Sequence, residues 1–341
     1  MPHTHTLKFA SLNLLNYTAP PYSFYQQHER YNNTQWQQKQ QFVRDFLFDS
    51  KADVVAFQEV FSAHALEIQC KEAGYDYFET VDCPSHDALY PQVLFNPIVA
   101  IASKYPFICV EPLTPCPELL EYLNNQSDFK FNRTPIKCFL NFPEFGEVCC
   151  YVVHFKSKRS LLNSVEDNSK TEEQNLLLQL KDQVAGRWAS SIQRGSEAAL
   201  LLIEIINRRS QTDNPVIVMG DFNNELHDGV LNHLITDSLR FTASRHSKAF
   251  TAKYALQDSW QLYQRHVVTD NEREATHYFG SSSSVFDYIL LSREFDAGFQ
   301  GSFYEVIDYH TYDQHLINPQ FAYDDQSTDH GVVMVTLALR S

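Results

Sequence analysis

A carboxylate and an amide stand two residues apart at the end of an apolar run, residues 216–223 (VIVMGDFN). Side chains alternate between the two faces of an extended chain, so Asp221 and Asn223 point to the same side. Gly220 leaves room for a close backbone approach or an unusual turn. An acid beside a neutral amide can align a water molecule and hold an anionic oxygen, as hydrolysis of a phosphate ester requires. Buried strands also end in Asp and Asn because these residues begin turns, so this segment alone does not decide the function.

Other apolar runs typical of strands are also flanked by side chains that bind metal ions or transfer protons. The elements that must position the chemistry are therefore strands. The flanking side chains are Asn13 in residues 7–14, Glu59 after residues 52–57, His154 after residues 148–153, and Asp329 and His330 before residues 331–337.

One acid lies inside an apolar run, at Asp287 in residues 285–291 (VFDYILL). A buried carboxylate is destabilising unless it is paired or hydrogen-bonded. Asp287 therefore needs a cationic or hydrogen-bonding partner, and a histidine would serve.

The order of these motifs resembles the endonuclease/exonuclease/phosphatase superfamily, which includes deoxyribonucleases, apurinic endonucleases, deadenylases, sphingomyelinases and inositol polyphosphate 5-phosphatases. The resemblance covers nearly the whole chain. It implies an α/β fold, a four-layer α/β/β/α sandwich with two mixed β-sheets packed face to face, helices on both outer faces and the site at one end of the sheets. The matching pieces are SLN at 11–13, FQEV at 57–60, FNRTPI at 131–136, HFKS at 154–157, GDFN at 220–223, FDYIL at 286–290 and TDH at 328–330.

The resemblance also implies a divalent metal ion. Glu59 is expected to bind Mg²⁺ directly, and Asn13 and Asp329 to support the ion directly or through water. Mg²⁺ takes one or two carboxylates, keeps several waters and completes its coordination with substrate phosphate. Mn²⁺ is the expected substitute.

The catalytic group implied by the resemblance centres on His330, whose usual pKa lets an imidazole change charge near neutral pH. Asp287 is expected to hold one ring nitrogen of His330. Asp221 is the competing general base, and the proton can belong to the pair. His154, which the deoxyribonuclease-like, sphingomyelinase-like and deadenylase-like branches share, would donate to a phosphate or leaving oxygen. Asn223 would hydrogen-bond the phosphate.

Basic residues near these motifs are candidates for binding substrate. Lys156 and Arg133 are expected to contact the phosphate, and Arg194 is a further candidate. Lys158 and Arg159 belong to the same basic patch, but a solvated loop is an equally good interpretation of these two. His277 begins another predicted strand and receives no role.

The composition limits the range of partners. The 341 residues show no linker or composition break, and the site residues come from both ends, so we expect one domain over residues 1–341, present as a monomer. The net charge of −15 repels nucleic acid and anionic membranes over most of the surface. A phosphodiester substrate therefore needs a metal ion and a local basic cluster.

Localisation follows from features that the sequence lacks. No apolar run of about 18 residues predicts a membrane span, and residues 1–6 lack the basic and apolar regions of a signal peptide. Seven irregularly spaced cysteines favour reduced thiols over disulfides or a zinc site. A cytoplasmic protein is the expectation.

Three segments outside the motifs have a predicted structure. Residues 18–36 are rich in aromatic side chains without a regular period and are predicted as a long loop, and residues 281–284 (SSSS) as a hairpin loop. Residues 160–190 are interpreted as an insertion next to the site that could form a lid; a surface excursion without a role is the alternative.

The combined interpretation is a Mg²⁺-dependent phosphoesterase that hydrolyses a phosphodiester, as a nuclease acting on short or single-stranded nucleic acid. A sphingomyelinase-like or other small-molecule phosphodiesterase or phosphatase is the alternative, although the sequence shows no apolar hairpin for membrane insertion. A phosphate-binding protein without activity on the same fold is the non-enzymatic alternative.

Overall fold

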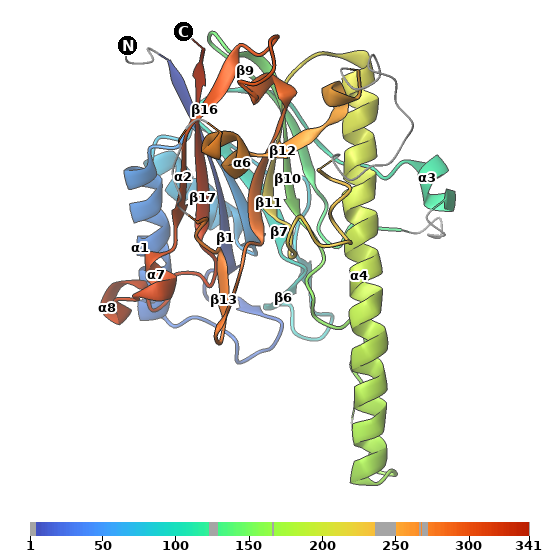
Figure 1. The fold of residues 1–341 in the computed structure, drawn as a ribbon. Coiled ribbons are helices and arrows are strands. Elements are labelled where there is room, and N and C mark those ends of the chain that lie inside the picture. The colour runs from blue at the N-terminus through green and yellow to red at the C-terminus, as the bar shows by residue number, and fades with distance from the viewer. Residues whose placement is uncertain are drawn as a thin grey trace.

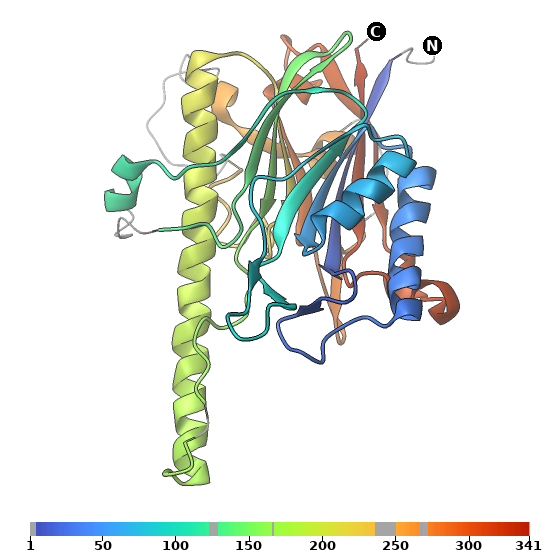
Figure 2. The ribbon, with the colours of Figure 1, turned by 180° about the vertical axis from the view of Figure 1, so that it is seen from behind.

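Two β-sheets packed face to face form the centre of the molecule, and helices cover the outer face of each sheet (Figures 1 and 2). This four-layer α/β/β/α arrangement confirms the predicted fold class. The first four residues, part of the segment compared with a signal peptide, lie outside the described part of the chain. The computed structural model describes residues 5–122, 129–165, 167–235, 250–265, 267 and 272–340.

The first sheet joins strands from both ends of the chain. β1 pairs in parallel with β3 and antiparallel with β17, so the sheet is mixed. The strands, in sheet order, are β16 (Tyr304–Tyr312), β17 (Val332–Leu339), β1 (Thr6–Tyr17), β3 (Val54–Val60), β7 (Ile98–Ser103) and β4 (Tyr77–Glu79).

The second sheet is also mixed, because β10 pairs in parallel with β11 and antiparallel with β9. Its strands, in order, are β12 (Leu256–Asp258), β15 (Asp287–Ser292), β11 (Val216–Asp221), β10 (Gly146–His154), β9 (Ile136–Phe142) and β8 (Phe107–Pro112).

Two small pairings lie outside the main sheets. The predicted aromatic loop contains a short strand, β2, which pairs with β6. The serine run predicted as a hairpin loop is mostly strand, because three of its serines pair with β13 and the turn falls at Gly280 and Ser281. The strands are β2 (Ser23–Phe24), β6 (Val93–Phe95) and β5 (Ser85–His86), and β13 (His277–Phe279) and β14 (Ser282–Ser284).

Alternating apolar side chains explain the layers. One face of each sheet contributes to the core between the sheets, where Phe9, Ile101, Ile217 and Val335 are buried together. The opposite face of the first sheet packs on α1 and α2, and that of the second on α4. A strand such as β11 is buried on both faces. Its residues are therefore apolar until the site begins at Asp221.

The helices lie mostly on the outer faces of the sheets (Figures 1 and 2). Capping boxes fix the starts of α1, through Asn32 and Gln35, and of α4, through Thr171 and Gln174. None of the helices in the described ranges is both long enough and apolar enough to cross a membrane. The helical elements are α1 (Asn33–Ser50), α2 (Ala63–Glu72), α3 (Pro117–Tyr122), α4 (Glu172–Gln211), η2 (Ala252–Tyr254), α6 (Ser259–Gln264), η3 (Arg293–Phe295), α7 (Gln314–Ile317) and α8 (Phe321–Asp324).

Helix α4 is one continuous element of 40 residues. Its C-terminal half packs on the second sheet, while its N-terminal half extends well beyond the end of both sheets (Figure 1). The predicted insertion at residues 160–190 is therefore a loop followed by the first turns of this helix. The loop runs along the helix, and the Leu161 amide donates to the Gly186 carbonyl.

Candidate active site

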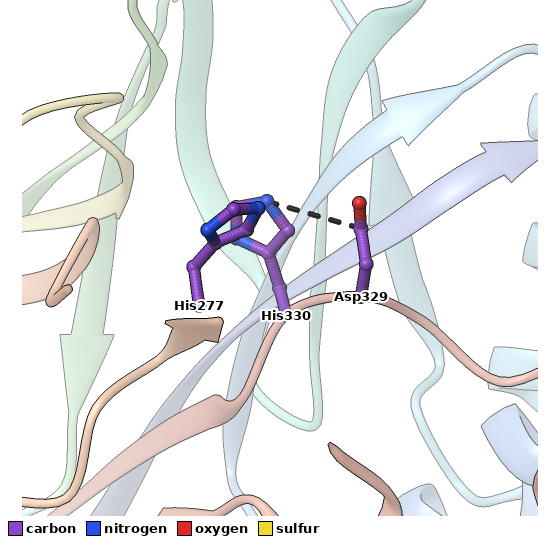
Figure 3. A group of neighbouring side chains, drawn as sticks. All are labelled: His277, Asp329 and His330. Carbon is purple, nitrogen blue, oxygen red and sulfur yellow. Dashed lines mark ion pairs between the residues drawn. The ribbon is translucent and has the colours of Figure 1, made fainter. Parts of the chain in front are cut away.

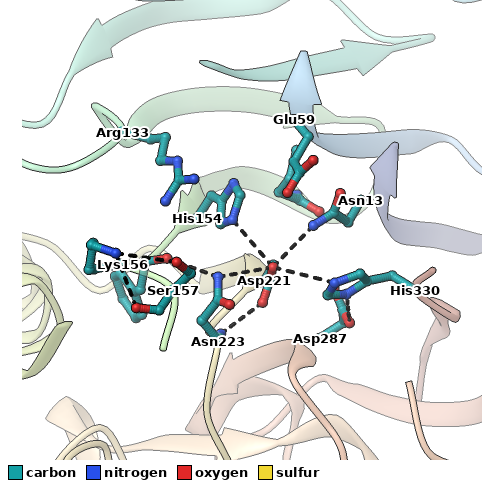
Figure 4. Close-up of polar contacts among 12 residues, drawn as sticks. Asn13, Glu59, Arg133, His154, Lys156, Ser157, Asp221, Asn223, Asp287 and His330 are labelled. Atoms are coloured by element: carbon teal, nitrogen blue, oxygen red, sulfur yellow. Dashed lines mark hydrogen bonds and ion pairs between the residues drawn. The ribbon is translucent and has the colours of Figure 1, made fainter. Parts of the chain in front are cut away.

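Candidate residues from the ends of several strands meet at one end of the two sheets (Figure 4). In the second sheet, Asp221 lies opposite His154 on one side and opposite Asp287 on the other. In the first sheet, Asn13 lies opposite Gln58, next to Glu59. Strand topology therefore assembles residues that are far apart in the sequence.

The backbone is unusual at three residues at the ends of β3 and β11. Glu59 and Asn223 have φ values of 60° and 52°, a region that side-chain-bearing residues rarely adopt and that often occurs at functional sites. Gly220 has a φ of 154°, and a Cβ atom there would overlap the Val153 carbonyl oxygen. The close approach of β10 to β11 thus requires the glycine.

Asp221 is the centre of the polar network (Figure 4). Its Oδ1 accepts the Asn223 backbone N–H at 2.7 Å, and its Oδ2 accepts from the side-chain amides of Asn13 and Asn223, each at 3.1 Å. His154 Nε2 lies 3.3 Å and His330 Nε2 3.9 Å from the same Oδ2. Burial raises the pKa of Asp221 to about 7; His330 opposes the increase and Asp287 adds to it. A carboxyl in this position can exchange a proton near neutral pH.

His330 and Asp287 are in contact, as the buried acid in β15 required. His330 Nδ1 lies 2.8 Å from Asp287 Oδ2, and both side chains are buried. Burial alone would lower the pKa of His330, but Asp287 and Asp221 raise it well above its usual value. The carboxylate fixes the ring orientation and favours the imidazolium.

His154 is buried beside Asp221 and close to Arg133 (Figure 4). Burial lowers its pKa well below the usual value, and the charges of Arg133 and His330 add to this effect. Its Nδ1 has no hydrogen-bond partner among the described residues. A neutral ring with an unused nitrogen is suited to a ligand.

The expected metal ligands differ in their surroundings. Glu59 and Asp329 line one pocket of about 640 Å³, and the Glu59 carboxylate accepts the Asn16 backbone N–H at 2.9 Å. Asn13 is buried outside the pocket lining, and its amide oxygen accepts the Leu15 N–H at 3.0 Å. Asn13 contacts Asp221 through its amide nitrogen, and its expected contact with the metal ion stays a prediction, because an amide oxygen keeps a second lone pair.

Two groups of described residues bring potential ligand atoms within 4.8 Å of one another. One contains His277, Asp329 and His330 (Figure 3), and the other Asp221, Asp287 and His330. The second group is buried; His330 Nδ1 is bonded to Asp287 Oδ2, while Asp287 Oδ1 has no hydrogen-bond partner among the described residues. The first opens to the pocket, since the Asp329 side chain is 51% exposed. The donors facing the pocket therefore suit a divalent cation with oxygen and imidazole ligands.

A cationic wall faces this carboxylate and histidine side of the pocket. It consists of Arg133, Lys158, Arg159 and Arg187, all of which line the pocket. Lys158 and Arg159, for which the sequence allowed a solvated loop, belong to the pocket.

Lys156 was expected to contact the substrate phosphate, but the structure places it outside the pocket. It is 6% exposed and does not line the pocket. Its ammonium donates to the Arg159 carbonyl at 3.1 Å and to the Ser157 side chain at 3.2 Å. Arg194 is also buried and donates to the Lys156 carbonyl at 2.8 Å. These two residues hold the loop that carries Lys158 and Arg159, because their charged groups are used inside that loop.

Sequence reasoning missed several residues that line the pocket. His277 stacks on Phe286 and lies 5.2 Å from His330, ring centre to ring centre. The feature of the sequence that could have identified His277 is its position at the start of a predicted strand. Gln183 and Arg187 come from α4, and no local motif marks them. Tyr25 and Phe279 complete the set.

Solved structures with the same fold were found at low sequence identity, and no curated protein sequence matches the chain. The catalytic domain of human Nocturnin with bound sulfate is 16% identical, with a TM-score of 0.57, and the alignment covers 98% of this chain and 95% of that chain. A humanized D. rerio TDP2 is 13% identical, with a TM-score of 0.56 and coverage of 97% and 98%. ANGEL2, described as a 2',3'-cyclic phosphatase, is 15% identical, with a TM-score of 0.54 and coverage of 97% and 95%. At these identities the likeness establishes the fold.

The family is established by the sequence itself. Residues 10–330 match the model described as the endonuclease/exonuclease/phosphatase family, and this range contains every candidate residue around Asp221. The chain therefore belongs to the endonuclease/exonuclease/phosphatase family and is a metal-dependent hydrolase of phosphoester bonds.

Proposed function

We propose that this protein is a Mg²⁺-dependent phosphodiesterase that acts as a nuclease on short or single-stranded nucleic acid. The observation that carries the proposal is the position of Asp221. It lies between two histidines and two asparagine amides, and it faces a pocket with carboxylates on one side and a cationic wall on the other.

In the proposed mechanism, Asp221 and His330 orient a water molecule and accept its proton. Asp287 holds His330 in place and stabilises the imidazolium that forms. His154 and Asn223 donate hydrogen bonds to the phosphoryl oxygens as negative charge develops on them, Asn223 by exchanging its hydrogen bond to the Phe155 carbonyl, which is 3.0 Å long, for one to substrate. These groups need little rearrangement during the reaction, because burial and mutual hydrogen bonds hold most of them in place.

Glu59 and Asp329 are the proposed ligands of Mg²⁺, with Mn²⁺ as a substitute. A bound ion polarises the phosphoryl oxygen and stabilises the leaving oxygen. The donor set fits, because Glu59 and Asp329 present carboxylate oxygens in one pocket. His277 is close to Asp329 and offers a nitrogen at the same edge (Figure 3).

Charge and size support the proposed substrate class. The cationic wall can hold phosphates next to the scissile one, while the net charge of −15 disfavours extended contacts with a long duplex. A pocket of about 640 Å³ is comparable to sites for small ligands and accommodates a few nucleotide units at most. A short, flexible strand meets both conditions.

A small phosphodiester with an apolar part, of the sphingomyelinase type, is the second candidate. One observation favours it: Phe279 lines the pocket and is 82% exposed at the end of β13. Tyr278 is exposed next to it. The sequence pattern had not revealed this aromatic hairpin.

We also propose one domain over the whole chain and a cytoplasmic location. Strands from both termini share one sheet, which supports a single domain. Cys138 and Cys150 lie opposite each other on β9 and β10 as buried free thiols, which supports a reducing compartment.

Hydrolysis of bis-p-nitrophenyl phosphate and p-nitrophenyl phosphate, with Mg²⁺ or with EDTA, tests the proposal. We expect turnover of the diester only with the metal, and slower turnover of the monoester. Oligonucleotides, plasmid and sphingomyelin are then compared at equal phosphate concentration. Full activity in EDTA would overturn the metal dependence, and preferential plasmid nicking or sphingomyelin cleavage would overturn the substrate class.

A further inference from the structure

The N-terminal half of α4 extends away from the sheets (Figures 1 and 2). The loop of residues 160–171 covers one side of it, through contacts to Asn175, Asp182 and Gly186. Near the sheets, Gln183 and Arg187 line the active-site pocket. This half of the helix is therefore held along one side, at the edge of the site.

The opposite side of the same half carries an apolar row. With 3.6 residues per turn, residues four apart form a ridge along a helix, and this ridge lies about half a turn away from the loop contacts. All members of the row are exposed, with Val184 at 67% and Trp188 at 68%. The apolar row consists of Leu176, Leu177, Leu180, Val184, Trp188 and Ile192.

An exposed row of this kind is unusual for a helix that extends from its domain. A contiguous apolar patch of large side chains marks an interaction site on most soluble proteins. The apolar row therefore requires a covering surface, and its i, i+4 spacing is the ridge that packs most often against another helix.

Charges along the exposed half of α4 select the orientation of a partner helix. Glu172 and Glu173 lie at its start, and Arg187 lies four turns later on the flank of the row. A second α4 running antiparallel places the acidic end of one helix beside Arg187 of the other, and opposes the helix dipoles. A parallel pair would bring like charges together.

We infer that the protein self-associates through the apolar row, forming an antiparallel pair of α4 helices around a two-fold axis near residue 180. An isologous contact of this kind is the common form of homodimer. It replaces the monomer expected from the sequence. Nucleic acid and anionic membranes fit less well, because this half of the helix carries acidic as well as basic side chains and the whole chain has a charge of −15.

The size of the contact predicts its strength. With the axis near residue 180, residues 172–188 of the two helices overlap over about 24 Å, at 1.5 Å per residue, and Ile192 lies beyond the contact. One helix face of this length buries less than the roughly 800 Å² per partner of a standard stable interface. The dimer should therefore dissociate in the micromolar range.

Sedimentation velocity over a micromolar dilution series tests the inference. Wild type should shift from monomer to dimer with concentration, and Leu180→Glu and Val184→Glu should stay monomeric. Phe321→Glu on α8, at a site that is 70% exposed, is the matched control and should dimerise as wild type does. Circular dichroism verifies that each variant keeps its helix content.

A charge exchange and a cross-link test the orientation. Glu173→Arg and Arg187→Glu should each weaken association, and the double variant should recover it. Leu180→Cys, at the residue that meets its own copy on the two-fold axis, should form a covalent dimer on mild oxidation beyond the background of wild type, whose Cys83 and Cys109 are exposed.

Three results would overturn the inference. The first is wild type that remains monomeric throughout the series. The second is Leu180→Glu dimerising as wild type does. The third is monomeric wild type that binds phosphatidylcholine vesicles through Leu180, which would assign the row to a lipid surface.

Discussion

The two sides of the pocket are held in place by different means. Asp221, Asp287, His154 and His330 lie at strand ends, are buried, and contact one another within 4 Å. The cationic wall comes from loops and from α4, and Lys158, Arg159 and Arg187 are exposed. One side is a buried cluster supported by the sheets, and the other is a set of mostly exposed side chains around it.

This difference assigns distinct tasks to the two sides. Groups that stabilise a transition state must be fixed before the reaction, since their reorganisation would raise the barrier. Exposed cations on loops can adapt to substrates of different length and contribute mainly to binding. Substitutions on the strand side should therefore lower kcat, while substitutions in the wall should raise KM.

The largest effect is expected from loss of the metal ion or its ligand. Glu59→Gln should lower kcat by at least about 10³-fold, which corresponds to about 4 kcal/mol of transition-state stabilisation. EDTA should have the same effect on wild type. Glu72→Gln, at an exposed position on α2, is the control and should keep full activity. An active Glu59→Gln enzyme would remove Glu59 from the site.

The pair of His330 and Asp287 should act as one unit. His330→Ala should reduce kcat by about 10³-fold, in the range for loss of a general base. Adding Asp287→Asn should cost little more, because the members of one unit are not additive. Steady-state kinetics of both single variants and the double variant measure this. Losses that multiply would show that the two residues act independently.

The same contrast explains how much could be predicted from the sequence. The residues that the structure brings together on the strand side were mostly among the predicted candidates, because polar residues at the ends of apolar runs are visible locally, as with Asp221 at the end of β11. Asp287 was found through the cost of burying its charge, and its partner is His330. The fold class followed from the order of these same motifs.

The wall was predicted only in part: Arg133 was expected to contact the phosphate and Lys158 and Arg159 were named as a basic patch, while Arg187 was not identified. Lys156 was chosen because it follows His154, yet its ammonium is satisfied by its own loop, which is a consequence of loop conformation. Arg187 reaches the pocket only because α4 continues past the sheets, and nothing near it in the sequence marks this position. His277 depends on the pairing of β13 with β14, whose serines read locally as a turn.

Smaller effects are expected from the cationic wall. Arg133→Gln and Arg159→Gln should each reduce kcat/KM on oligonucleotides by about tenfold, through KM, and reduce the salt slope of binding by about one charge. Lys170→Gln, exposed and outside the pocket lining, is the control. Lys156→Gln should lower stability and leave the salt slope unchanged. A lower kcat with unchanged KM in the arginine variants would contradict the division between the two sides.

The smallest effect is expected at Glu197 of α4, which joins the wall to the helix. Its carboxylate accepts the backbone N–H groups of Asn132 at 2.6 Å and Lys156 at 2.7 Å, beside Arg133 and before Lys158. Glu197→Gln keeps only one acceptor oxygen, so it should cost about 1–2 kcal/mol of unfolding free energy. KM should rise a few-fold without a change in kcat, because only the wall is loosened.

The pH dependence of this variant provides a further test with a definite sign. Burial raises the pKa of Glu197, while hydrogen bonds from Gln193, Asn132 and Lys156 oppose the increase. A carboxyl whose pKa is raised by folding stabilises the protein below its unfolded pKa, and this contribution is lost as pH rises through the folded pKa. The stability difference between wild type and Glu197→Gln should therefore be largest in acid and shrink toward neutral pH, as measured by denaturant unfolding at several pH values. A difference that grows with pH would mean that the two backbone hydrogen bonds outweigh burial, and that the wall is anchored by a charged carboxylate.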